Sequence, residues 1–350
     1  MPDGSPPAHP RTLRRAADLV AAGLVPPDER AALEAVEARY ATAIPPALAA
    51  LIGDRNDPIG RQFVTHPDEL LSAPHELADP IGDEALSPVR GIVHRYPDRA
   101  LLKPILACPV YCRFCFRREQ VGPDGGVLSE AELDAAYAWL RAHPGVHEVI
   151  LTGGEPLLLS ARRLRAIFDA LAAIPHLGLL RIHTRLPVAD PARLDAALAE
   201  ALGAAATPLW LVVHVNHARE LTEAAVASLR RVQAQGIPVL GQSVLLRGVN
   251  DSVDALAELF GGMLAARVKP YYLHQLDPAP GTSRFHVPVA EGLRLLRALR
   301  GRISGLAWPT YVLDIPGGRG KVPLGPAYLE GDRAVADPWG GRHAMVAPAG

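Results

Sequence analysis

The chain of 350 residues lacks the features that mark a membrane, secreted or nucleic-acid-binding protein. No stretch approaches the ~18 consecutive apolar residues of a membrane-spanning helix. The opening MPDGSPPAHPRTLRR has no apolar core of a signal peptide. The 36 basic and 37 acidic residues leave a net charge of −1, without the surplus of one sign that a broad nucleic-acid or membrane surface requires. We therefore expect a cytoplasmic protein with neither kind of partner.

Cysteine is scarce and confined to one place. The chain has three cysteines, Cys108, Cys112 and Cys115, and all lie within eight residues. An odd number at this spacing excludes the disulfide framework of a small secreted domain. It indicates instead a reducing compartment and a bound metal.

The chain does contain enough apolar residues, 49% of the total, to bury a sizeable core. Residues 1–90 are rich in proline, and only RTLRRAADLVAAGL and DERAALEAVEARYATAI place apolar residues at helical spacing. We therefore expect an N-terminal helical and irregular extension over 1–90, a core domain over 91–316, and a glycine-rich loop with a C-terminal tail over 317–350.

From about residue 98, short apolar runs alternate with amphipathic helical segments, which predicts parallel strands covered by helices. Six such units are too few for an eight-unit barrel. We expect a partial (β/α)6 barrel, with a doubly wound sheet as the alternative. The expected strands are ALLKPILA, EVILTG, LLRIHT, PLWLVVHV, PVLGQSVLL, VKPYYLHQL and a last extended piece, PTYVLD. The expected helices cover 130–143, 161–173, 190–203, 217–235, 252–266 and 289–301.

Polar residues lie in or just after each of the six strands. The carboxyl ends of successive barrel strands converge on one mouth, so we expect these residues to share a site. Taken singly, His183 and His274 can equally be hydrogen-bonded core residues. The polar groups, in chain order, are Cys108, 152–155 (TGGE), 183–185 (HTR), 214–217 (HVNH), Gln242 with Ser243, and 274–277 (HQLD).

The cysteines have the spacing Cys108-Pro-Val-Tyr-Cys112-Arg-Phe-Cys115 and follow the first expected strand. Three thiolates in one short loop suit a four-iron cluster. With no fourth cysteine in the chain, one iron would stay open to a small molecule. The alternatives are a zinc site completed by histidine, or buried free thiols, although zinc ligands usually come as two separated pairs.

Together the motifs resemble the lysine 2,3-aminomutases, a family of radical S-adenosylmethionine (SAM) enzymes. The resemblance covers about residues 28–330 and implies a radical-SAM partial barrel that holds a [4Fe-4S] cluster, SAM and pyridoxal phosphate. It implies an isomerase that converts L-lysine to β-lysine by radical migration of the amino group from C2 to C3. The motifs are HRYPDR (94–99), CPVYCRFCFRR (108–118), TGGEPLL (152–158), QSVLLRGVND (242–251), RVKPYYLHQLD (267–277) and VLDIPGGRGK (312–321).

The resemblance also implies how the cofactors are held. The open iron would chelate the amino and carboxylate groups of SAM. Gly153 and Gly154 would allow a close backbone approach, and the carboxylate of Glu155 would accept from the SAM ammonium. The positions that match the family's other cofactor-holding residues are Arg95, Arg99, His214, Gln242 and Ser243. Of these, an arginine is a natural bidentate phosphate ligand.

Pyridoxal phosphate needs a lysine for its Schiff base, and this chain offers only three. Lys103 and Lys269 fall inside or at the start of expected strands. Lys321 follows the last strand in Pro-Gly-Gly-Arg-Gly-Lys, which we expect to be a mobile loop over the barrel mouth, and it matches the family's pyridoxal lysine. We therefore assign the catalytic lysine to Lys321. A phosphate-binding P-loop is the alternative, but Ile315 and Val322 break its pattern.

Substrate specificity follows from charge. Arg117, two residues beyond the last cysteine, matches the family's ligand for the substrate carboxylate, and Asp277 and Asp314 match its ligands for a lysine side chain. Two carboxylates at one end of a pocket would attract an ammonium and repel a glutamate side chain. The alternative for each aspartate is a turn or helix cap.

Several functional questions stay open at this point. Two fates of the β-lysine stay as alternatives, a free product and attachment to elongation factor P, because the chain lacks the extra cysteines of the free-lysine enzymes. Another amino acid such as glutamate is an alternative substrate, and a zinc-stabilised binding module without activity is a remote alternative. The reaction would also require an electron donor such as a flavodoxin or ferredoxin, and a homo-oligomer is compatible with the sequence.

Overall fold

The computed structural model describes residues 11–330, 334–339 and 341–344. The first ten residues of the predicted extension and the rest of the predicted tail lie outside the described residues. Among the helices of the described ranges, none is both long enough and apolar enough to cross a membrane.

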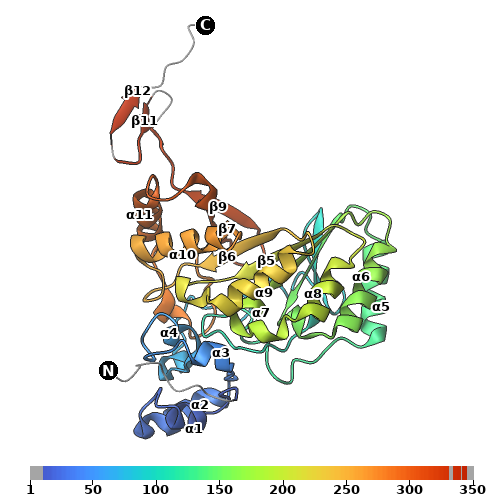
Figure 1. Ribbon diagram of the computed structural model, residues 1–350, viewed down its shortest axis with the longest axis horizontal. Helices are drawn as coiled ribbons and strands as arrows, with labels where there is room; N and C mark the ends of the chain where they lie inside the picture. Colours follow the sequence, from blue (N-terminus) through green and yellow to red (C-terminus); the bar gives the residue numbers. More distant parts are fainter. Residues whose placement is uncertain (1–10, 331–333, 340, 345–350) are drawn as a thin grey trace.

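A nine-stranded sheet forms the centre of the molecule, with its strands in the order of the sequence (Figure 1). Strands β2 to β8 are parallel to one another, whereas β1 and β9 pair antiparallel at the two edges. The strands are β1 (Ile92–Tyr96), β2 (Arg99–Ile105), β3 (Glu148–Gly153), β4 (Leu179–Thr184), β5 (Leu209–His214), β6 (Val239–Val244), β7 (Lys269–His274), β8 (Thr310–Asp314) and β9 (Lys321–Gly325).

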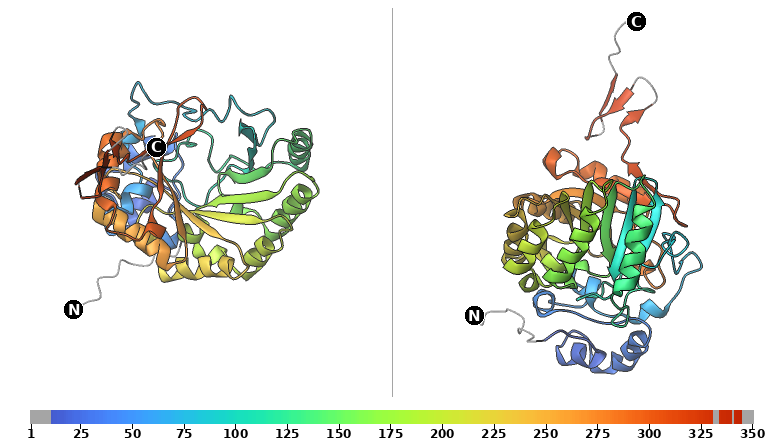
Figure 2. Two further views of the ribbon diagram at one scale, coloured as in Figure 1. Left: turned by 90° about the horizontal axis from the view of Figure 1, so that it is seen from above. Right: turned by 90° about the vertical axis from the view of Figure 1, so that its right-hand side faces the viewer.

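Six helices follow strands β2 to β7 and form an arc outside the sheet (Figure 2, left). Five of these helices begin with a side chain that accepts a hydrogen bond from a backbone N–H of the first turn: Ser129, Ser160, Asp195, Thr222 and Ser252. The helices are α5 (Glu130–Arg141), α6 (Ala161–Ala172), α8 (Ala196–Gly203), α9 (Glu223–Gln233), α10 (Val253–Ala265) and α11 (Val289–Leu299).

These elements confirm the predicted partial (β/α)6 barrel with a seventh parallel strand. The strand order never reverses, which excludes the doubly wound sheet. Within the described residues β1 and β9 do not pair with each other, so the barrel stays open. The predicted helix over 190–203 begins later, at Ala196, after the short helix α7 (Leu186–Ala189) and Pro191.

The strands of the barrel alternate between an inner and an outer face. On β4, Leu180 and Ile182 belong to the large apolar core shared with the covering helices, whereas Arg181 and His183 face the barrel interior. The same alternation holds on β3, where Val149 contributes to that core. Charged and polar side chains therefore enter the interior of this barrel, unlike the packed apolar centre of a closed barrel.

The N-terminal extension contains four short helices at one end of the molecule: α1 (Ala16–Ala21), α2 (Arg30–Glu37), α3 (Pro46–Ala49) and α4 (Gly60–Phe63) (Figure 1). They enclose a separate apolar core that also includes Val110 of the cysteine loop and Ala189 of α7. The extension therefore packs directly on the loop that carries the three cysteines.

At the other end of the molecule, a small antiparallel sheet stands apart from the barrel (Figure 2, right). Its strands are β10 (Leu329–Glu330), β11 (Ala334–Ala336) and β12 (Arg342–Ala344). The division of the chain at residues 90 and 316 into separate domains stays a prediction.

One difference from the expected structure concerns Lys321, the predicted pyridoxal lysine. The sequence analysis placed Lys321 in a mobile loop, but Lys321 begins strand β9 and pairs with Asp314 of β8. Its backbone N–H also donates to the Tyr96 hydroxyl at 2.7 Å. The glycine-rich segment forms only the connection between these strands, and Lys321 is fixed by the sheet.

A buried ion-pair network joins the extension to the cysteine loop. Glu69 is fully buried, and its Oε2 accepts from Arg113 Nη2 and Arg118 Nη2, both at 2.5 Å. Burial disfavours the charge, but the two arginines outweigh it and lower the pKa of Glu69 to about 2. The network therefore holds two of the three arginines of the segment CPVYCRFCFRR, Arg113 and Arg118, in place.

We expect Glu69→Gln to lower the free energy of unfolding by about 3–5 kcal/mol, because it leaves buried guanidinium groups without their counter-charge. Chemical denaturation of the variant checks this, with Glu84→Gln on the exposed neighbouring segment as the matched control. Equal denaturation midpoints for the two variants would contradict the assigned role of the network.

Candidate active site

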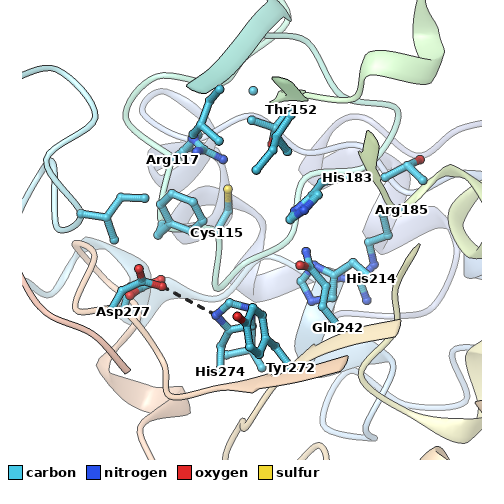
Figure 3. Close-up of a pocket in the computed structure, with 18 of the residues that line it drawn as sticks. Cys115, Arg117, Thr152, His183, Arg185, His214, Gln242, Tyr272, His274 and Asp277 are labelled. Atoms are coloured by element: carbon cyan, nitrogen blue, oxygen red, sulfur yellow. Dashed lines mark ion pairs between the residues drawn. The ribbon is translucent and has the colours of Figure 1, made fainter. Parts of the chain in front are cut away.

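The open barrel encloses a cavity of about 580 Å³ that extends from the starts of strands β2 and β3, at Arg99 and Glu148, to the strand ends and the cysteine loop. In Figure 3, Thr152 of β3, His183 of β4, His214 of β5 and Tyr272 and His274 of β7 surround one space together with Cys115. All but one of the residues assigned from the sequence line this cavity: Arg95, Arg99, Cys108, Cys112, Cys115, Arg117, Gly153, Gly154, Glu155, His214, Gln242, Asp277, Asp314 and Lys321.

Ser243 is the exception: it does not line this cavity, and its role in cofactor binding stays a prediction. Gln242 lines the cavity, but the next residue of a strand points to the opposite face. The Ser243 side chain is fully buried, and its hydroxyl donates to the Val215 carbonyl oxygen at 2.5 Å. Ser243 therefore stabilises the pairing of β6 with the end of β5.

All three cysteines are free and line the cavity. Burial raises the pKa of Cys108 well above its ordinary value and that of Cys115 to about 11. Within the described residues no three His, Cys, Asp or Glu side chains converge on a single metal ion. A four-iron cube takes each thiolate on a different iron, so it does not require such convergence. The loop therefore has the donor set for a cluster.

The Cys112 thiol has a hydrogen-bond partner within the protein, the side chain of Arg185. Arg185 Nη1 lies 3.1 Å from Cys112 Sγ, while Arg185 Nη2 donates to Gln62 Oε1 and Glu220 Oε2, both at 2.7 Å. All four groups are buried away from solvent or nearly so. The extension, through Gln62, thus positions a guanidinium against one cysteine sulfur.

Glu155, the predicted acceptor for the SAM ammonium, already has four hydrogen-bond donors within the protein. Its Oε1 accepts from Leu157 N and Thr184 Oγ1, and its Oε2 accepts from the backbone N–H groups of Arg185 and Leu186, all within 3.1 Å. A carboxylate has about four acceptor positions, and these are all used. Glu155 therefore fixes the loop after β4 and is not free to accept from an ammonium.

The two glycines before Glu155 are needed for close packing. Gly153 has φ +109°, and a Cβ on Gly154 would lie 2.3 Å from the Ala107 carbonyl oxygen. Only glycine tolerates this approach of β3 to the chain that leads into the cysteine loop. The glycines were predicted to allow a close backbone approach to SAM. In this structure they allow a close approach between two segments of the protein.

Arg117, the predicted carboxylate ligand, is held by a residue that the sequence analysis missed. Arg117 Nε donates to Asp83 Oδ2 at 2.7 Å, and Lys103 Nζ lies 3.6 Å from the same oxygen. Burial disfavours the charge on Asp83, but Arg117 outweighs it and lowers the pKa of this carboxyl. Since only Nε of Arg117 is used, its two terminal nitrogens remain for a carboxylate.

The predicted lysine-binding carboxylates differ from each other. Asp314 Oδ1 accepts from Arg95 Nη1 at 2.8 Å, and Asp314 Oδ2 accepts from Lys321 Nζ at 2.5 Å. Burial disfavours the charge, but His274 and Lys321 hold the pKa of Asp314 well below its usual range. Asp314 is therefore an anion with two cationic partners already in place.

Asp277 is an isolated carboxyl at the same end of the cavity. No hydrogen bond to its side chain is present within the described part of the chain. Burial, and then the nearby Asp314 charge, raise the pKa of Asp277 to about 7. The predicted pair of anions is thus one paired carboxylate and one carboxyl that is partly protonated near neutral pH.

Arg99, the second arginine of HRYPDR, lies at the end of the cavity where the strands begin. Arg99 pairs with Asp98 at 3.0 Å and stacks 3.9 Å over the Tyr96 ring. Arg181, which the sequence analysis did not single out, also lines this end and donates to Glu148 at 2.7 Å. Period-two alternation along β4 is the signal that pairs Arg181 with His183 on the inner face.

His183 and His274 both line the cavity, and His274 Nδ1 lies 3.2 Å from Lys321 Nζ. Burial lowers the pKa of His183 well below its ordinary value, and it lowers that of His274 to about 4. The Nε2 atoms of both rings are buried and have no partner within the described residues. Both rings are therefore neutral and have unused hydrogen-bonding capacity in the site.

The polar partial barrel and the cysteine loop at its mouth define a radical SAM protein, and the model of the radical SAM superfamily matches residues 102–260. A second model, described as lysine-2,3-aminomutase, matches residues 296–335. The chain belongs to the lysine 2,3-aminomutase family.

Three curated relatives support this assignment. The L-lysine 2,3-aminomutase of Clostridium subterminale is 40% identical over 82% of this chain and 69% of its own length. That of Bacillus subtilis is 39% identical over 82% of this chain and 61% of its own length. That of Escherichia coli K12 is 40% identical over 78% of this chain and 79% of its own. The chain thus spans between three fifths and four fifths of these proteins.

Among solved structures, a radical SAM methyltransferase from Sphaerobacter thermophilus is 21% identical over 63% of this chain and 68% of its own, with a TM-score of 0.43. This similarity is too low for a comparison of residues.

The raised pKa of Asp277 predicts a pH-dependent stability. The unfolded chain ionises this carboxyl near 3.8 and the folded protein near 7, so the free energy of unfolding falls as pH rises between these values and then levels off. Asp277→Asn should remove this pH-dependent loss of stability, because an amide does not ionise.

We compare the free energy of unfolding of Asp277→Asn with that of the wild type by chemical denaturation. The difference in favour of the variant should grow by about 2 kcal/mol or more as the pH rises from near 5 to near 8. The exposed Asp124→Asn serves as the matched control. A difference between Asp277→Asn and the wild type that does not change with pH would show that Asp277 ionises normally.

Proposed function

We propose that this protein is an isomerase that converts L-lysine to β-lysine by moving the amino group from C2 to C3. The observation that carries this proposal is that one cavity contains a three-cysteine loop, a single lysine amine and charged groups of both signs. Family membership supports the reaction class, and the cavity supports the substrate.

The cysteine loop fits a [4Fe-4S] cluster with an open iron for SAM, and Lys321 fits pyridoxal phosphate. All three lysines of the chain are described, and Lys321 alone among them lines the cavity. Arg95, Arg99 and Arg181 supply cationic donors nearby for a phosphate. When bound, the cluster and SAM supply a radical that removes a hydrogen atom, and pyridoxal phosphate carries the migrating nitrogen.

The chain's own residues set the orientation of the substrate. The terminal nitrogens of Arg117 are free to bind the substrate carboxylate, and Asp83 prevents this arginine from turning away. Asp314 and Asp277 lie at the end where a lysine side chain would place its ammonium. A glutamate side chain would meet the charge of Asp314 there, so we propose lysine as the substrate.

The same proposal includes a cytoplasmic reaction and an external electron donor such as a flavodoxin or ferredoxin. Whether the product stays free or is attached to elongation factor P depends on partners outside this cavity.

Anaerobic incubation of the reconstituted protein with reductant, SAM and pyridoxal phosphate tests the substrate assignment. We expect lysine to be converted in preference to glutamate, ornithine and alanine. Asp277→Asn should lower kcat/KM for lysine by roughly 10- to 150-fold, because it removes a charge-assisted hydrogen bond. Asp254→Asn, a surface variant, is the control. Preference for glutamate or alanine would overturn the lysine assignment but not the reaction class.

Borohydride reduction in the presence of pyridoxal phosphate tests which lysine amine binds the cofactor. We expect peptide mapping to find the pyridoxyl label on Lys321, and Lys321→Ala to abolish it. Lys103→Ala and Lys269→Ala should both keep the label. Labelling that persists at another lysine in Lys321→Ala would show that the assignment of Lys321 is wrong.

A further inference from the structure

Lys103 of β2 has a buried amine for which the proposed function has no role. Only 9% of its surface is exposed, and it lines a second cavity of about 270 Å³ instead of the active-site cavity. Lysine is almost never buried without a partner of opposite charge. Burial lowers the pKa of Lys103, and the charge of the neighbouring Asp83 opposes this effect. The position of Lys103 therefore requires an explanation that includes Asp83.

Asp83 is a buried carboxylate that two cations share. Its Oδ2 accepts from Arg117 Nε at 2.7 Å and lies 3.6 Å from Lys103 Nζ. A third cation, Arg95, is 3.9 Å from Asp83 Oδ1, but it also pairs with Asp314 at 2.8 Å. Arg117 and Lys103 are thus the two cations that meet at one oxygen of Asp83.

The charges of this cluster bear on the substrate, because Arg117 is the proposed ligand for its carboxylate. Asp83 orients Arg117, but its negative charge also cancels the positive charge of the guanidinium. A substrate carboxylate at the terminal nitrogens of Arg117 would then be repelled by the carboxylate behind them. Buried charges are only weakly screened, so this repulsion is not negligible. The ammonium of Lys103 leaves the group of three with a net charge of +1.

We propose that Lys103 is a positioning residue for the substrate carboxylate: its ammonium offsets the charge of Asp83, so that Arg117 is oriented by one carboxylate and still attracts another. Lys103 acts through Asp83 and Arg117 and does not touch the substrate, since it lies outside the active-site cavity. The inference rests on the proposed function and deepens it, because it makes a ligand carboxylate a condition for tight binding.

Calorimetric titration with L-lysine and L-lysinamide tests this role. The protein carries its cluster and pyridoxal phosphate, and SAM and reductant are left out to prevent turnover. Lysinamide has both amines of lysine but a neutral amide in place of the carboxylate. Lys103→Met keeps an unbranched side chain and removes the ammonium. We expect it to weaken lysine binding at least about tenfold and lysinamide binding less than about threefold.

Two further variants control for the loss of a buried side chain. Lys103→Arg keeps the positive charge, and its lysine affinity should stay within about threefold of the wild type. Lys269→Met removes a lysine whose Nζ donates to the Pro270 and Trp308 carbonyl oxygens outside the cavity. Its affinity for both ligands should equal that of the wild type.

A double variant tests the charge balance by rescue. Adding Asp83→Asn to Lys103→Met removes the opposing charge, while the amide oxygen can still accept from Arg117 Nε. This variant should recover most of the lost lysine affinity. It also replaces the buried pair as a unit, which proteins tolerate better than the removal of one partner. The double variant therefore tests the proposal even if Lys103→Met fails to fold.

Three results would overturn the proposal. The first is an unchanged lysine affinity in Lys103→Met. The second is an equal loss for lysine and lysinamide, which would indicate a purely structural role for Lys103. The third is a double variant that binds lysine at least about tenfold more weakly than the wild type.

Failure of this proposal can be separated from failure of the proposed function. If the wild type converts lysine but Lys103→Met binds it equally well, only the role of Lys103 is wrong. If the wild type binds neither lysine nor lysinamide, the proposed substrate fails. The same comparison with glutamate and its α-amide then decides the role of Lys103.

Discussion

The carboxylate of Asp314 is the contact on which the rest of the site depends. It joins Arg95 of β1 and Lys321 of β9, the two antiparallel edge strands, to its own position at the end of β8. In an open barrel these edge strands have no shared backbone pairing, so side-chain contacts must define how the opening is arranged. One buried anion between two cations does this, and it places the amine inside the cavity.

The cysteine loop is held by residues outside the barrel. Glu69 of the extension binds Arg113 within this loop, and Gln62 binds Arg185, whose guanidinium lies against the Cys112 sulfur. The loop also buries apolar side chains of its own, Val110 and Phe114. The extension adds a constraint through buried charge, which gives the irregular N-terminal segment a direct role in the site.

Much of the fold and site was predictable because it follows from local patterns. The β–α alternation and the polar strand ends correctly located the barrel and its mouth, and the scarcity of lysine and cysteine limited the candidates for each chemical role. The differences from the structure have physical causes. Ser243 was assigned with Gln242, although adjacent strand residues face opposite sides. Glu155 was assigned to a ligand because three of its four protein donors, at residues 184–186, come from a segment distant in sequence.

The sequence also did not predict the contact of Asp83 with Arg117 or the pairing of Lys321 with Asp314. Asp83 lies in an irregular segment without periodicity, so nothing in the sequence indicates that it reaches Arg117. Lys321 follows a glycine-rich segment that suggests mobility, yet the glycines only form the turn that leads into β9. Charge patterns along the chain identify the groups, but the structure is needed to show which of them neutralise one another.

Because the chain has only three lysines, its ammonium groups can be observed individually by NMR. Protein labelled with nitrogen-15 at the lysine side chains should show a Lys321 ammonium signal whose protons exchange slowly with water, owing to the hydrogen bond from Lys321 to Asp314. That signal should lose its protection in Asp314→Asn and disappear in Lys321→Ala. A Lys321 ammonium that exchanges as fast in the wild type as in Asp314→Asn would contradict the bridging role of Asp314.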